Sequence, residues 1–168
     1  PLSVEGPIKV TNALPPRIWF QRVAYVAEHI ETNEEGTMDR CLRHMIHLAQ
    51  LAPGPLGDLS RPRIEESAFE VLVAAGKYDV ASLGMISDLA TCAVRYDEQS
   101  RLFSAAIGLS ALAIAVEFTS QTVAHAVLTA WVQCFLAVNS IYGGKFNAIG
   151  DALQHTDQLG QPQPPTEH

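Results

Sequence analysis

Residues 102–144 contain a single charged side chain, Glu117, in a chain of 168 residues of which 17% are charged. So long an uncharged stretch belongs in a protein core, in a subunit interface or in a membrane. Its first half has apolar residues at alternating spacings of three and four, which is the period of a helix. These residues are Leu102, Ala105, Leu109, Leu112 and Val116. We therefore predict a helical hairpin, with one helix over about 98–118 and a second over about 120–142.

The second helix of this hairpin is predicted to be apolar on two faces. One face carries Val123, Val127, Ala130, Cys134 and Ile141, and the other carries Ala124, Leu128, Trp131, Phe135, Val138 and Tyr142. Because most helices of a small bundle lie at its surface, surplus apolar area is commonly buried against another chain. We therefore expect a subunit interface at Leu128, Trp131, Phe135, Val138 and Tyr142. The alternative is that the other helices of the same chain surround this one.

A membrane hairpin is the third interpretation of this stretch. A span needs about 20 mostly apolar residues, but 123–142 include His125, Gln133 and Asn139, among other polar residues. No belt of Trp and Tyr and no cluster of Lys and Arg flanks the pair, as membrane-spanning helices usually have. We expect the protein not to span a membrane.

The rest of the chain also favours helices, separated by Pro and Gly. Helical periodicity and caps predict further helices over about 17–32, 37–52, 62–75, 80–95 and 146–155, with a loop at 53–58. The predicted fold class is all-α: a single-domain bundle of five to six main helices. Residues 1–16 are expected to form an extended N-terminal arm, 17–158 the bundle, and 159–168 a polar Pro-rich tail.

Composition excludes several classes of function. The formal charge is −7 and 48% of residues are hydrophobic, which excludes a disordered chain and a strongly basic nucleic-acid binder. No phosphate-binding loop, dinucleotide fingerprint, nucleophile elbow or calcium loop is present. We expect no cofactor and no specific nucleic-acid partner.

The histidines of the first two predicted helices form the best candidate metal site. His44 and His47 lie three residues apart on one helical face, and His29 and Glu28 on the preceding helix are candidate further ligands. Arg40 and Arg43 make the same face cationic, which repels a metal ion. We therefore expect no metal and interpret this face as a solvated surface, with Arg or His pairing to Glu28 or Glu31.

The three cysteines, Cys41, Cys92 and Cys134, are odd in number and lack zinc or CxxC spacing. We expect three free, buried thiols and no disulfide, although Arg40 and His44 near Cys41 leave a reactive thiol open as an alternative. The N-terminal residues lack the basic and apolar regions of a signal peptide. We therefore expect an intracellular protein or part of an assembled particle.

These observations favour a non-enzymatic structural subunit that self-assembles into a homo-oligomer, such as a viral or phage coat or shell protein. The predicted contacts are the 102–142 hairpin and the terminal arms. Two other hypotheses stay open. One is a small helical enzyme or metal-binding bundle using His29, His44, His47 and nearby carboxylates, and the other is an intracellular adaptor or chaperone-like binding module.

Overall fold

The computed structural model describes residues 12–31 and 36–159, with side chains as far as Asp151. Most of the predicted arm and tail, residues 1–11 and 160–168, lies outside the described residues. The elements in chain order are α1 (Pro16–Ile30), α2 (Thr37–Gln50), α3 (Gly54–Ser60), α4 (Glu66–Ala74), α5 (Tyr78–Gly84), β1 (Thr91–Asp97), β2 (Leu102–Leu109), the short 3₁₀ helix η1 (Ser110–Leu112), β3 (Ile114–Ser120) and α6 (Val123–Leu159).

The first two helices form as their sequences predict. Pro16 starts α1, and its apolar stripe of Trp19, Val23, Val26 and Ile30 is buried, as the periodicity indicates. The Trp19 indole N–H donates a hydrogen bond of 2.7 Å to the carbonyl of Leu48, which joins α1 to α2 inside the core. The buried indole is therefore satisfied as well as packed.

The sheet corrects the predicted fold class. Residues expected to be helical form three antiparallel strands in the order β1-β2-β3, so the protein is mixed α/β and the all-α prediction is wrong. In β2 the side chains of Ala105, Ile107 and Leu109 are buried and Ala106 between them is exposed. This alternation has a period of two and is typical of a strand with one buried face. Ala105 and Leu109 also fit a helical stripe, which is why the helical interpretation failed.

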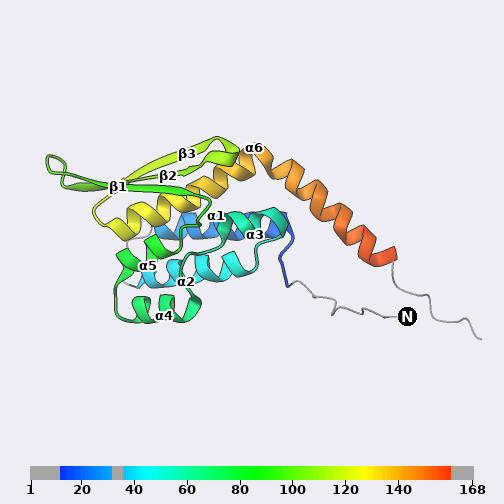
Figure 1. Cartoon of the computed structure of the whole chain (residues 1–168), viewed down its shortest axis with the longest axis horizontal. Coiled ribbons are helices and arrows are strands. Elements are labelled where there is room, and N and C mark those ends of the chain that lie inside the picture. Colours follow the sequence, from blue (N-terminus) through cyan, green and yellow to red (C-terminus); the bar gives the residue numbers. More distant parts are fainter. Residues whose placement is uncertain (1–11, 32–35, 160–168) are drawn as a thin grey trace, which may run out of the picture.

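α6 lies between the sheet and α1, as Figure 1 shows. Its face toward the sheet includes Cys134, whose thiol lies 3.6 Å from the carbonyl of Ile107 in β2. Its opposite face includes Phe135, whose ring meets the Trp19 ring edge-on at 5.1 Å. α6 is apolar all round because other elements of the same chain cover it on both sides.

The remaining elements differ from the prediction in detail. The expected loop at 53–58 contains most of α3, the helix expected over 80–95 is reduced to α5 followed by β1, and the helix expected over 62–75 is α4. Gly143 and Gly144 do not end a helix, because α6 continues through them. α4 ends at Ala74, close to the predicted end at 75: Gly76, just beyond it, has φ +68, and the amides of Gly76 and Lys77 bond back to the carbonyls of Val73 and Leu72.

Candidate functional site

The predicted histidine site is only partly assembled. His29 of α1 and His44 of α2 line one pocket of about 460 Å³, together with Arg22, Tyr25 and Arg40. The Tyr25 ring lies 3.9 Å from the His29 ring and 5.7 Å from the His44 ring. Glu28 and His47 do not line this pocket, and both are exposed.

The electrostatics of this pocket are cationic. The pKa of His44 is lowered by burial, and Arg22, His47 and His29 lower it further. Within the described part of the chain, no three His, Cys, Asp or Glu side chains are grouped so that they could hold a metal ion. Of the cationic side chains on this face, Arg43 pairs with Asp39 at 2.6 Å and with Glu70 of α4.

The three cysteines are free, and they lie in different environments. Cys41 and Cys134 are buried, whereas Cys92 in β1 is partly exposed. Burial raises the pKa of the Cys41 thiol, and Arg40 offsets this only in part. Burial also raises the pKa of Cys92, and raises that of Cys134 to about 12. Because the thiolate is the reactive form, these environments disfavour the reactive-thiol alternative at Cys41.

The residues predicted as an interface on α6 lie in the chain's own core. Leu128, Trp131, Phe135 and Val138 are at most 2% exposed, and Tyr142 is partly exposed with its hydroxyl donating to the carbonyl of Leu112. These four buried side chains leave almost no surface for a second chain. Among the described residues, α6 over Val123–Asp151 is long and apolar enough to span a membrane. In the most apolar 18-residue window of this helix, 61% is buried inside the chain.

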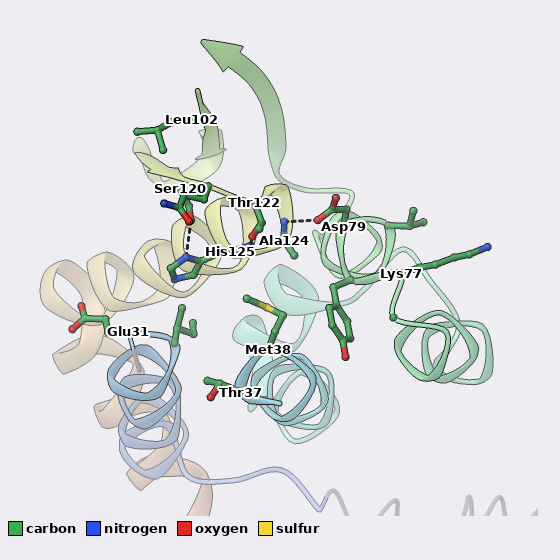
Figure 2. A pocket seen from close by; sticks show the side chains of 15 residues that line it. Glu31, Thr37, Met38, Lys77, Asp79, Leu102, Ser120, Thr122, Ala124 and His125 are labelled. Atoms are coloured by element: carbon green, nitrogen blue, oxygen red, sulfur yellow. Dashed lines mark hydrogen bonds between the residues drawn. The ribbon is translucent and has the colours of Figure 1, made fainter. Parts of the chain in front are cut away.

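A larger groove, of about 780 Å³, lies at the N-terminal end of α6 (Figure 2). Its apolar lining includes Ile30, Met38 and Leu102, which belong to three different elements. Its polar lining includes Ser120, Gln121, Thr122 and His125, from the end of β3 and the start of α6. Grooves of this size that combine an apolar wall with a few converging polar groups are typical of ligand sites.

Ser120 and His125 face each other in this groove. The Ser120 hydroxyl oxygen lies 2.6 Å from Nδ1 of His125, and both side chains are partly exposed. The Phe118 ring packs edge-on against the imidazole at 5.9 Å. Burial lowers the pKa of His125, and a hydrogen bond to the backbone of Ile30 raises this pKa by a smaller amount. Sequence reasoning identified His125 only as a polar residue of an apolar helix, and nothing in the sequence pattern indicated Ser120 as its partner.

Two side chains hold the start of α6 in place. The Asp79 carboxylate of α5 accepts a hydrogen bond of 2.8 Å from the amide of Ala124, and the Thr122 hydroxyl accepts one of 3.2 Å from the amide of His125. Both bonds satisfy amides of the first helical turn, which have no partner within the helix. The position of the His125 side chain therefore depends on caps from the loop before α6 and from α5.

The strand β1 is the most exposed part of the sheet. Six of its seven residues are exposed and only Cys92 is partly covered, although Cys92, Val94 and Tyr96 lie on the side of the sheet that packs on α6 elsewhere. In Figure 1 the tip of the β1–β2 hairpin extends beyond the helices, and on this side of β1 Val94 is 36% and Tyr96 is 53% exposed. Five of the ten large apolar side chains that are exposed in the described chain lie between residues 80 and 96: Val80, Leu83, Leu89, Val94 and Tyr96.

The comparisons with known proteins give no match: no family model, no curated protein and no solved structure is similar to the chain.

Proposed function

We propose that the protein is a self-associating subunit in which two copies pair through their β1 strands. The observation that carries this proposal is the uncovered apolar side of an edge strand, where Val94 is 36% and Tyr96 is 53% exposed. A strand at the edge of a sheet presents unpaired backbone N–H and C=O groups that can bind another strand. β1 has neither the Pro nor the Lys residues that protect many edges.

β1 is preferred to β3 as the pairing edge because their side chains differ in burial. β3 lies against α6, and Ile114 at its start is 6% exposed. A partner strand at β1 would cover Val94 and Tyr96, whereas a partner at β3 would cover little additional apolar surface. The free energy of apolar burial therefore favours pairing at β1.

The sequence of β1 is suited to pairing with itself. An antiparallel pair centred on Val94 uses all seven residues and places Val94 opposite Val94 of the second copy, with Cys92 opposite Tyr96. On the other side of the sheet, Arg95 meets Ala93 and Asp97 meets Thr91. No like charges lie directly opposite each other, and every apolar residue of the α6 side meets another one. The result is a two-fold symmetric dimer with a continuous six-stranded sheet.

This proposal retains the self-association expected from the sequence and places the contact on β1 instead of α6. It predicts a dimer with about twice the 18.2 kDa mass of the chain, to be measured by size-exclusion chromatography with light scattering over a range of concentrations. Val94→Lys and Val94→Glu should each be monomeric, because each places like charges opposite each other at the two-fold axis. An equimolar mixture of the two variants should recover the dimer mass.

The matched control is Val71→Lys on α4, since Val71 is 68% exposed and lies outside β1. This variant should remain a dimer, and circular dichroism should show all four proteins folded alike. A wild-type chain that stays monomeric at every concentration would overturn the proposal. A Val94→Lys variant that keeps the dimer mass would show that the contact lies elsewhere, which also contradicts it.

A further inference from the structure

The pair Ser120 and His125 has the geometry of a nucleophile and its base. An activated serine is recognised by a hydrogen bond to a histidine that a third group orients. Here the serine oxygen lies 2.6 Å from Nδ1. The backbone of Ile30 also interacts with the imidazole, in the sense that favours its protonated form. A hydrogen on Nε2 leaves Nδ1 as an acceptor for the serine proton.

The surroundings of His125 favour its neutral form, which is the form that a general base needs. Burial is the main cause of its lowered pKa, so the imidazole is neutral at pH 7. The charged side chains lining the same groove are Glu31, Lys77 and Asp79. Asp79 is bonded to the amide of Ala124, so its carboxylate is directed at the helix backbone.

We propose that Ser120 is a nucleophile toward carboxylic esters, with His125 as its general base. The Ser120 oxygen attacks the carbonyl carbon and its proton passes to Nδ1 of His125. The bond from that carbon to the leaving oxygen then breaks, and His125 returns the proton to the departing alcohol. Water, deprotonated by His125 in the same way, hydrolyses the acyl-serine and restores the free hydroxyl.

The groove indicates the kind of ester. Ile30, Met38 and Leu102 provide an apolar wall beside the polar pair, which suits an acyl group with a hydrocarbon chain. The amides of Ala124 and His125 are already bonded to Asp79 and Thr122. These two amides therefore cannot also stabilise the oxyanion that forms on the substrate carbonyl, so we expect slow ester turnover. Acylation of Ser120 is then a more sensitive measurement than turnover.

The test uses a fluorophosphonate probe, which reacts with activated serines, and locates the label by peptide mass spectrometry. The wild-type chain should be labelled at Ser120, and Ser120→Ala should carry no label. His125→Gln should be labelled roughly 100-fold more slowly, which is in the usual range for loss of a general base. Ser140→Ala, which removes an exposed serine of α6 far along the helix from the groove, should be labelled like the wild type.

The pH profile provides a readout that a purely structural pair would not change. The labelling rate of the wild type should fall as the pH drops through the pKa of His125, with a midpoint below the ordinary histidine value of 6.5. If His125→Gln does not fold, this pH profile of the wild type still tests the role of His125. The proposal is overturned if the wild type is unlabelled or labelled at another residue, or if its rate at Ser120 has no such midpoint. Because Val94→Lys leaves this groove intact, it should be labelled like the wild type, which separates this proposal from the dimer.

Discussion

At the scale of single residues, Asp79 links two elements that are 45 positions apart in the chain. Its carboxylate lies in the first turn of α5 and accepts a hydrogen bond from the amide of Ala124 at the start of α6. Asp97 accepts hydrogen bonds from the amide of Gln99 and the hydroxyl of Ser100 in the β1–β2 turn. Short acidic side chains bind whichever free amides lie nearby, so their sequence position alone does not identify their partner.

We expect Asp79→Ala to lower the free energy of unfolding by about 1 kcal/mol, the usual cost of losing a side-chain cap. Asp79→Asn should cost much less, because the amide oxygen can still accept the bond from Ala124. Urea unfolding of the three proteins measures the difference. Equal losses in the two variants would show that the charge of Asp79, not the hydrogen bond, is what stabilises α6.

At the scale of elements, α6 is the central helix of the fold. The sheet covers one of its faces and α1 covers the other, so the apolar surface expected to meet another chain is used within the same chain. Phe135 lies at the centre of this arrangement, 4.6 Å from the Trp131 ring and 5.1 Å from the Trp19 ring. Edge-on aromatic contacts of this kind add to the stabilisation from apolar burial.

Phe135→Ala should therefore lower the free energy of unfolding by about 3–5 kcal/mol, the range for removing a large buried aromatic side chain. The loss should be the same at low and high protein concentration once the Val94→Lys background removes the proposed dimer. Ile141→Ala on the same helix is the control, since Ile141 is 61% exposed and should cost under about 0.5 kcal/mol. If the loss of stability in Phe135→Ala becomes smaller at high protein concentration, even in the Val94→Lys variant, the result would support an interface at α6 instead.

At the scale of the whole molecule, two partly buried histidines link stability to pH. The pKa values of His44 and His125 are both lowered in the fold from the ordinary 6.5, with burial as the main cause. When the pH falls below 6.5, the unfolded chain therefore takes up protons at these sites before the folded chain does, which favours unfolding. The lowered pKa of Asp97 has its effect only below the ordinary value of 3.8.

We expect the urea midpoint of the wild type to decrease from pH 7.5 to pH 5.5. The double variant His44→Gln and His125→Gln should show a smaller decrease over the same interval, because the groups that gain protons on unfolding are gone. Gln50→Ala is the control on α2, since it removes an exposed side chain that does not titrate, and its midpoint should decrease as in the wild type. A midpoint in the double variant that falls as steeply as in the wild type would contradict this linkage.

The elements that could be predicted from the sequence are those whose signals are local. The stripe of α1, the Pro at its start and the Gly76 turn at the end of α4 each depend on neighbouring residues, and the structure has them as predicted. The apolar character of 123–142 also predicted a helix with two buried faces, although the sequence left open what would cover them.

For residues 91–120 the choice between helix and strand depends on tertiary contacts. Ala105 and Leu109 satisfy both periods, and the strand conformation wins because β1, β2 and β3 pair with each other and β2 and β3 pack on α6. Such pairing joins residues that are distant in the chain, so no local window contains it. The same reason applies to the candidate sites: the uncovered side of β1 and the groove at Ser120 and His125 exist only once the sheet, α1 and α6 have come together.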